Sequence, residues 1–278
     1  MNIQEFTGVV FAISAVAGFL GALTGLGGGV VVTPALMILL GVDLHYAMGA
    51  SLVSVIATSS GAAAAFVKEG FSNVRLGMFL EIATTLGAVA GAHLTAVIPA
   101  SGLALIFGVV LLYSAWHSLQ QPREQIDPHP DPLATRLKLD GVYPGPGGPI
   151  HYHAQRVKAG FSLMFGAGLL SGLLGIGSGA MKVIAMDQVM RIPFKVSTTT
   201  SNFMIGVTAA ASAGIYLSRG YIRPGLAMPV MLGVLAGSLV GARMLMGAKP
   251  KALRLVFAAV IALMAAEMIY NGLYGGMK

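Results

Sequence analysis

Two short glycine-rich segments interrupt long apolar runs of the sequence, and their backbone could bind an anion. The first reads GLGGG at Gly25–Gly29 and the second reads GIGSG at Gly175–Gly179. Glycine lets successive backbone N–H groups point at one spot, and helices beginning at Val30 and Ala180 would add positive dipole ends. This pattern favours an anion held by backbone donors; the competing interpretation is that small residues merely allow close helix packing. The predicted backbone donors are Gly27, Gly28, Gly29, Gly177, Ser178 and Gly179.

Hydroxyl side chains recur on the segments that follow both glycine runs. Ser51, Ser54 and Thr58 share one face of a helix, and Ser201 and Thr208 repeat that face. Neutral donors suit an oxyanion that must be released again, whereas a buried charge pair would hold it tightly. The alternative is that each hydroxyl bonds the carbonyl one turn earlier on its own helix. The candidate side-chain donors are Ser51, Thr200, Ser201 and Asn202.

Few charged residues lie inside the apolar runs, and such residues are candidates for function. Lys182 follows Gly179 by three residues, close enough to neutralise a bound anion, although it could also snorkel to the interface or pair with Asp187. Glu81 and Glu267 could carry protons. The histidines at 129, 151 and 153 lack carboxylates at ligand spacing, and the glycine run lacks the GK[ST] ending of a nucleotide-binding loop. We therefore expect no metal and no cofactor.

The composition requires most of the chain to lie in a membrane. Of 278 residues, 56% are hydrophobic and 10% are charged, and the mean hydropathy is +0.81, whereas soluble domains carry about 25% charged residues. The net charge of +7 comes from basic residues between the apolar runs, which indicates membrane topology and not nucleic-acid binding. The segment MNIQEFTG has no basic region typical of a signal peptide, so we expect it to be retained. The absence of cysteine excludes disulfides and thiolate metal sites.

The second half of the sequence echoes the first at a shift of 150 residues. Residues 18–93 align with 168–243 without a gap and share 16 identities in 76 positions. Gly87 and Gly91, with their echoes Gly237 and Gly241, have the four-residue spacing of helix-packing glycines. This single register predicts two structural repeats.

The length of the first apolar stretch of each half decides how the repeats are related. Residues 8–41 as one helix would span about 50 Å, far more than a hydrocarbon core of about 30 Å. A hairpin that enters and leaves on one face leaves three crossings in each half, so the second half is inverted. With the N-terminus outside, this model places 12 basic residues in the cytoplasm and three outside; a plain eight-span model gives ten and five.

The predicted fold is therefore an all-α integral membrane protein. It consists of two inverted four-segment repeats, each a re-entrant glycine-tipped hairpin plus three transmembrane helices. The first repeat covers residues 1–118 and the second 157–278, and residues 119–156 form a polar cytoplasmic loop. Within that loop, TRLKLDGVYPGPGGPIHYHA could fold into a small β-hairpin around its Pro-Gly turns. Inverted repeats with broken helices are typical of secondary transporters that bind substrate near the midplane.

The residues also resemble a known family. GFLGALTGLGGGVVVTPAL, GVDLHYAMGASLVSVIATSSGA, KEGFSNVRLGMFLEIATTLGAVAGA and the weaker copy from Gly168 to Arg243 resemble the TauE/SafE sulfite exporters. The resemblance implies a multi-pass carrier of the inner (plasma) membrane for sulfite, organosulfonates or similar small anions. The chain departs from the pattern in the long polar insert, and its second glycine segment has Ser178 where the first has Gly28.

Several alternatives to a sulfur-oxyanion carrier remain open. An anion channel would not show counterflow, and a carrier for another small anion or a carboxylate would share the same architecture. A membrane enzyme is not expected, because the spans contain no Ser/His/Asp set, no HExxH motif and no paired aspartates. The expected partners are a small anionic substrate and membrane lipid, with no nucleic acid and a possible homo-oligomer.

Overall fold

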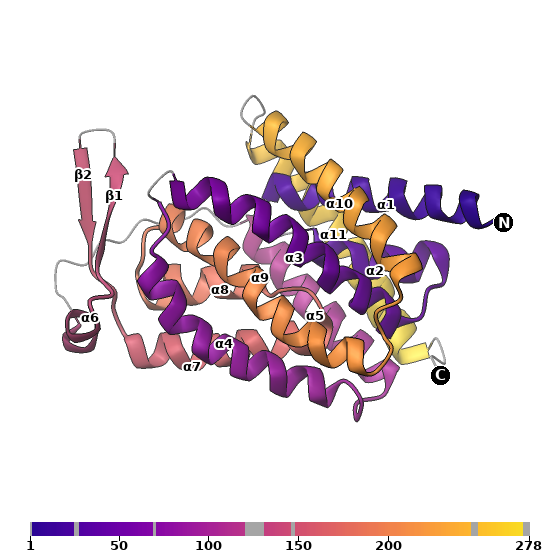
Figure 1. Ribbon diagram of the computed structural model, residues 1–278, viewed down its shortest axis with the longest axis horizontal. Coiled ribbons are helices and arrows are strands. Elements are labelled where there is room, and N and C mark those ends of the chain that lie inside the picture. Colours follow the sequence, from indigo (N-terminus) through magenta and orange to yellow (C-terminus); the bar gives the residue numbers. More distant parts are fainter. Residues whose placement is uncertain are drawn as a thin grey trace.

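The computed structural model describes residues 2–24, 28–68, 71–119, 131–145, 148–245 and 250–274, and these are mostly helical (Figure 1). The first half contains α1 (Ile3–Thr24), α2 (Gly29–Leu40), α3 (Leu44–Lys68), α4 (Val74–Leu94) and α5 (Ala100–Leu119). A connecting unit contains α6 (Pro132–Leu137), β1 (Gly141–Gly145) and β2 (Gly148–Tyr152). The second half contains α7 (Val157–Leu174), α8 (Gly179–Ile184), the π-helical turn η1 (Ala185–Val189), α9 (Phe194–Ser218), α10 (Pro224–Leu245) and α11 (Pro250–Tyr274).

The helices have the length and surface of membrane spans. Within α1, α4, α7 and α10, the described residues form stretches long and apolar enough to cross a membrane. On α4, Met78, Ile82 and Leu86 lie four residues apart and are exposed, as expected for a lipid-facing stripe. The opposite face of α4 is buried and rich in glycine and alanine. The prediction of an all-α multi-pass membrane protein is confirmed.

Helices from the two halves pack against each other through glycine. α1 packs on α10, and α4 packs on α7. A Cβ at Gly87 would lie 2.1 Å from the backbone oxygen of Phe165, and one at Gly237 would lie 1.9 Å from that of Ala15. These two contacts are related by the 150-residue shift. The predicted packing role of Gly87 and Gly237 is confirmed, because no larger residue fits between the helices.

The helices that correspond in the two halves run antiparallel. Along α3 and α9, the Tyr216 hydroxyl lies near the sulfur of Met48, while Ser59 donates to the backbone oxygen of Asn202. The start of α3 therefore meets the end of α9. α5 and α11 pair in the same antiparallel sense. In contrast, α1 runs parallel to α10 and α4 runs parallel to α7, as their glycine contacts require.

The first two helices of each half fold back on each other. A Cβ at Gly28 would lie 3.2 Å from the Cα of Gly18, which places the start of α2 against α1. In the second half, the backbone N–H of Gln155 donates to the oxygen of Met190 at 2.9 Å. The chain therefore enters α7 beside the place where it leaves η1. Each of these pairs is a helical hairpin.

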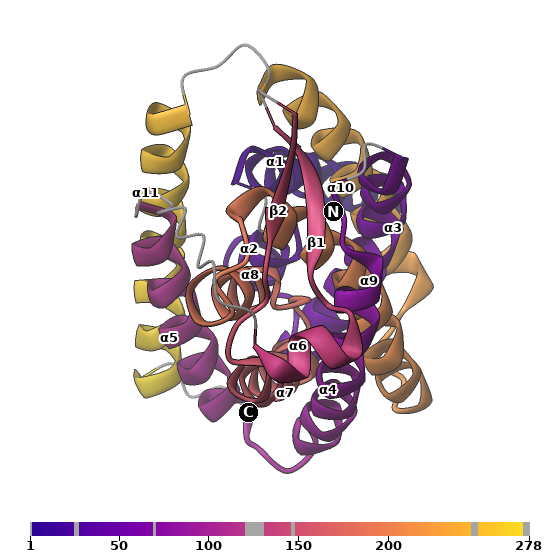
Figure 2. The ribbon, with the colours of Figure 1, turned by 90° about the vertical axis from the view of Figure 1, so that its left-hand side faces the viewer.

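The connecting unit forms a small cap at one end of the helices (Figure 2). β1 and β2 pair as an antiparallel hairpin, with Gly141 opposite Tyr152 and Gly145 opposite Gly148. The predicted hairpin in this loop is confirmed. The short helix α6 was not expected from the sequence; it is capped by Asp131, whose carboxylate accepts a hydrogen bond from the backbone N–H of Leu133 at 2.8 Å.

Candidate functional site

The two glycine segments are each tied to the next long helix by one hydroxyl. The Ser51 hydroxyl donates to the backbone oxygen of Gly29 at 3.0 Å, and the Ser201 hydroxyl donates to that of Gly179 at 3.2 Å. Both serines are buried, and both bonds join residues 22 positions apart. The predicted donors Ser51 and Ser201 thus lie at the two segments, where they hold the backbone. Of the first segment, residues 25–27, including the predicted Gly27, lie outside the described residues.

The two segments, which we call the tips, meet at Val55. A Cβ at Gly29 would lie 2.4 Å from Cγ2 of Val55, and one at Gly177 would lie 3.0 Å from its Cγ1. The same Cβ at Gly29 would lie 3.6 Å from the backbone oxygen of Ile176. Val55 lies near the middle of α3, and Ile205, which packs against Gly177 from the other side, lies near the middle of α9. The sequence-predicted tips are therefore together, at mid-length of the longest helices.

Three buried hydroxyls near the tips have no hydrogen-bond partner among the described residues: those of Thr33, Ser171 and Ser178. Ser178 was a predicted donor; its backbone is left-handed, with φ of 47°, which places it in the turn before α8. Thr33 and Ser171 were not predicted, although each lies four residues from a tip glycine, Gly29 and Gly175. An unpaired buried hydroxyl costs about 1–3 kcal/mol, so a polar ligand that paired with one of these groups would recover that cost.

Lys182 has partners of its own at the second tip. Its side chain is fully buried, and its Nζ lies 3.8 Å from Oε2 of Glu81 and donates a hydrogen bond to the Thr208 hydroxyl. The Thr208 hydroxyl donates to Oε1 of Glu81 at 2.6 Å, and the Thr85 hydroxyl donates to the same oxygen at 3.2 Å. In this arrangement the lysine charge faces a carboxylate, so it is already balanced.

The remaining predicted side-chain donors are Thr200 and Asn202, and hydrogen bonds of both residues join α9 to other elements. The Thr200 hydroxyl accepts a hydrogen bond from the backbone N–H of Asn73 at 3.0 Å. The Asn73 amide donates to the Tyr152 hydroxyl of the cap at 2.8 Å. The backbone oxygen of Asn202 accepts from Ser59, which packs α9 on α3. Thr200 and Asn202 thus connect helices and cap, and the structure does not bring their bonded groups to the tips.

Two further hydroxyls of the predicted polar face bond to their own helix. Ser54 donates to the backbone oxygen of Ser51 at 2.7 Å, and Thr58 donates to that of Ser54 at 3.0 Å. For these residues the alternative interpretation from the sequence is correct. Such local bonds satisfy a hydroxyl inside a membrane helix without a ligand.

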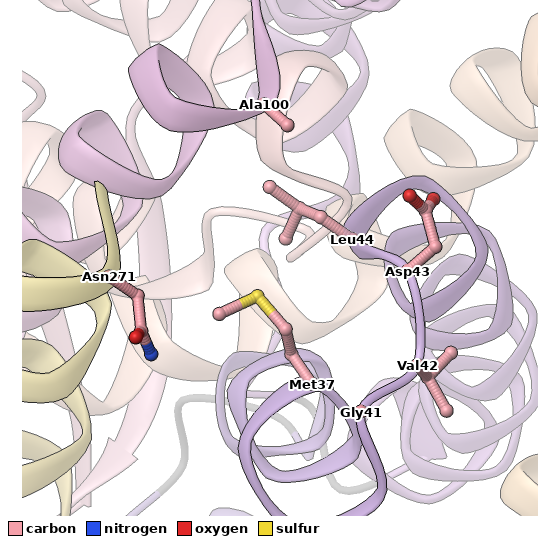
Figure 3. Close-up of a pocket in the computed structure, with 7 residues that line it drawn as sticks. All are labelled: Met37, Gly41, Val42, Asp43, Leu44, Ala100 and Asn271. Atoms are coloured by element: carbon pink, nitrogen blue, oxygen red, sulfur yellow. The ribbon is translucent and has the colours of Figure 1, made fainter. Parts of the chain in front are cut away.

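A cavity of about 250 Å³ opens away from the tips, between the α2–α3 connection, α5 and α11 (Figure 3). Figure 3 shows Met37 and Leu44 reaching toward it, with Asp43 and Asn271 as its polar groups. The Asp43 carboxylate already accepts a hydrogen bond from the backbone of His45 at 2.9 Å. None of the predicted site residues lines this cavity.

Comparison with known proteins identifies the relatives of this chain. The family model described as "Sulfite exporter TauE/SafE" matches residues 10–268. The "Probable membrane transporter protein YunE" of Bacillus subtilis is 26% identical over 274 residues, which are 96% of this chain and 98% of that protein. "Probable membrane transporter protein YdhB" of the same organism is 25% identical over 243 residues, 84% and 87% of the two chains. A "Probable membrane transporter protein" of Xylella fastidiosa is 26% identical over 242 residues, 87% of this chain and 85% of the relative. No solved structure gives a significant match.

Proposed function

The chain belongs to the sulfite exporter TauE/SafE family, and from this membership we propose that it is a secondary transporter of small sulfur-containing oxyanions, such as sulfite or an organosulfonate. Family and relatives make it a membrane transporter, which fits a protein that is not an enzyme. The substrate class and an alternating-access mechanism are our proposal.

The observation that carries the proposal is the meeting of the two tips around Val55. Backbone away from regular helix is tolerated at membrane depth only inside protein or along a wet cavity. Here the described residues of both tips are buried, and each tip is fixed by one serine hydroxyl to the long helix that follows it. Two such tips at one place supply backbone N–H donors and no fixed charge, which suits an oxyanion that binds and leaves.

We propose that the repeats are inverted and that the two hairpins are re-entrant. Antiparallel pairing of α3 with α9, and of α5 with α11, supports a two-fold axis perpendicular to these helices. The bond between Gln155 and Met190 supports a hairpin that enters and leaves at one face. With the N-terminus outside, the cap lies in the cytoplasm. Tyr46 near the start of α3 and Arg223 just before α10 then lie outside, where the Arg223 guanidinium donates to the Tyr46 hydroxyl at 2.7 Å.

Within this site we assign the direct substrate contacts to the tip backbone at Gly28, Gly29, Gly177 and Gly179 and to the Ser178 hydroxyl. Ser51 and Ser201 position the tips. We assign the observed arrangement, in which Val55 packs against both Gly29 and Gly177, to a closed state of the transport cycle. Substrate enters when one tip moves away from Val55, and alternating access follows if the two tips move in turn.

Counterflow in proteoliposomes tests this function. Vesicles that contain the purified protein and unlabelled sulfite or isethionate should take up the labelled anion transiently and with saturation. Ser178→Ala should raise the half-saturating concentration about tenfold, the effect of about 1.4 kcal/mol, without lowering thermal stability, because the lost hydroxyl has no partner among the described residues. Ser14→Ala is the matched control, since the buried Ser14 hydroxyl also has no partner among the described residues and the Cβ of Ser14 lies against Gly233 of α10, away from the tips.

Three results would contradict the proposal in distinguishable ways. Flux without saturation or counterflow would identify an anion channel. Counterflow of acetate or another carboxylate, with none of sulfite or isethionate, would identify a carrier for a different anion. Equal effects of Ser178→Ala and Ser14→Ala on half-saturation would remove Ser178 from the site.

A further inference from the structure

A buried charged cluster next to the second tip has no role in the proposal above. Glu81 comes from α4 of the first half and is 7% exposed, while Lys182 and Thr208 come from the second half and are fully buried. Thr208 bonds to both charged groups, and the Lys182 and Glu81 charges lie 3.8 Å apart. One carboxylate oxygen, Oε2, has no hydrogen-bond partner among the described residues and faces only the lysine charge.

The fold does not require these charges. The 150-residue shift relates Lys182 to Val32, Glu81 to Met231 and Thr208 to Thr58. The corresponding place consists of Val32 and Thr58 of the first half and Met231 of the second half, so it has two apolar side chains and one hydroxyl, and that hydroxyl bonds its own helix. Buried ion pairs can often be replaced by apolar residues without loss of stability, and here the repeat places Val32 and Met231 at the positions that correspond to Lys182 and Glu81. Charged residues at membrane depth that packing does not require indicate a functional role.

The surrounding elements leave Glu81 and Lys182 as each other's counter-charge. α4 also carries Arg75 near its start and His93 near its end, both exposed. The other ionisable groups on packed elements lie at helix ends or outside the cluster: Lys158 on α7, Lys195 and Tyr216 on α9, His45, Tyr46 and Lys68 on α3, and Asp187 on η1. No second carboxylate occurs in the sequence of α4, α7, α8 or α9.

The lysine is directly connected to the second tip. Its backbone N–H donates to the oxygen of Ser178 at 3.1 Å, so its side chain starts one helical turn from the unpaired Ser178 hydroxyl. If Glu81 were neutral, the buried ammonium would have no counter-charge, a state that is unfavourable inside a protein. An anion at Ser178 and Gly179 would then restore the balance.

We propose that Glu81 is a proton-binding site that couples anion binding to proton uptake, an inference that rests on the proposed transport function. A proton from the aqueous phase adds to the Glu81 carboxylate, and the Lys182 ammonium stays protonated and becomes the counter-ion of the substrate. One proton and one monovalent anion then move together, with no net charge. When the anion leaves, Glu81 releases its proton on the same side and pairs with Lys182 again. The coupling is reciprocal, because whatever raises the affinity for the proton raises that for the anion.

The experiment uses isethionate, a sulfonate that remains a monoanion throughout the working pH range. Proteoliposomes containing the full-length protein and a trapped pH dye report proton and labelled-anion fluxes together. For the wild type we expect one proton per isethionate, accumulation driven by a pH gradient, and anion binding that tightens by up to about tenfold per unit fall in pH, as linkage of one proton to one anion requires. Glu81→Gln, a neutral mimic of the protonated acid, should lose at least tenfold of the gradient-driven accumulation while its counterflow persists and its anion affinity no longer varies with pH.

Glu267→Gln is the matched control, because Glu267 is an exposed carboxylate on α11 and should behave as the wild type. Wild-type counterflow that ignores a pH gradient, or Glu81→Gln proteoliposomes that still couple protons to isethionate, would overturn the inference and leave the proposed function intact. Should Glu81→Gln fail to fold, the proton-to-anion ratio of the wild type decides the question alone. Absence of any isethionate or sulfite flux in the wild type would refute the proposed function, and the inference with it.

Discussion

Replacing Gly29 with alanine tests whether the packed tips are a working state of the transporter. A Cβ at this position would lie 2.4 Å from Cγ2 of Val55 and 2.8 Å from the Ser51 hydroxyl oxygen. Carbon atoms in contact need about 3.5–4.0 Å, so the gap is short by more than about 1 Å. Valine in a helix has one strongly preferred rotamer, and Val55 therefore cannot turn away. The first tip must retreat from α3 instead.

The size of the effect follows from two lost interactions. A retreat of about 1 Å lengthens the Ser51 to Gly29 hydrogen bond from 3.0 Å beyond hydrogen-bonding range, which costs about 1 kcal/mol. Overpacking adds about 1–3 kcal/mol. The packed state should thus be disfavoured by about 2–4 kcal/mol, and a 2 kcal/mol penalty alone lowers its population relative to the open state about 30-fold.

Counterflow and a double-mutant cycle measure this effect. We expect Gly29→Ala to reduce the counterflow rate about 30-fold or more. Val55→Ala removes the clashing methyl group, so the double variant should transport at a rate within about threefold of that of Val55→Ala alone. The melting temperature of each variant separates impaired transport from loss of folded protein. Wild-type counterflow in Gly29→Ala, or a double variant as slow as the single one, would refute the assignment of the packed tips to the transport cycle.

Three further predictions concern packing, the second tip and the cap. Gly172→Ala places a Cβ 1.9 Å from a backbone oxygen of α4 and should destabilise the protein by about 3 kcal/mol or more in a thermal-shift assay. In the same assay Gly166→Ala, on the same helix, should be neutral or slightly stabilising, because its added Cβ meets nothing within 4 Å. Ser201→Ala leaves the buried oxygen of Gly179 without this donor and should cost about 1–3 kcal/mol by the same assay, with slower counterflow. Burial raises the pKa of Tyr152 to about 12, although the hydrogen bond from the Asn73 amide opposes the rise, so stability should be constant below pH 10 and fall between pH 10 and 12. Tyr152→Phe should remove the part of that fall that comes from Tyr152, as measured by unfolding experiments between pH 8 and pH 12.

The sequence was sufficient to predict features that depend on local chemistry or on the repeat. Glycines four residues apart predicted close helix contacts, and the structure places Gly87 and Gly237 against backbone oxygens, where only a glycine fits. The Pro-Gly turns predicted the β1–β2 hairpin. The single register of the repeat predicted that the tips correspond, and the serine bonds at Gly29 and Gly179 match one another in that register.

Side-chain partners across distant segments could not be predicted in the same way. Thr208 bonds to Glu81, which lies 127 residues away in the other half, and neither residue has a local pattern that indicates the other. For the same reason the sequence did not indicate that Lys182 faces Glu81 or that the Thr200 hydroxyl accepts a hydrogen bond from Asn73. These pairings depend on how α4 packs against α9, which apolar periodicity alone does not determine.

Val55 gives the two tips a physical means of affecting each other. Its two methyl groups point to different halves of the molecule, one toward Gly29 and the other toward Gly177. Both contacts are so tight that even one added carbon at either glycine would collide, which means that the three groups are packed as one unit. When one tip moves, Val55 loses a packing contact, and the free energy of the packed position of the other tip changes as well. A carrier needs this kind of coupling between its two tips, because two tips that moved independently could be open at the same time and let ions leak across the membrane.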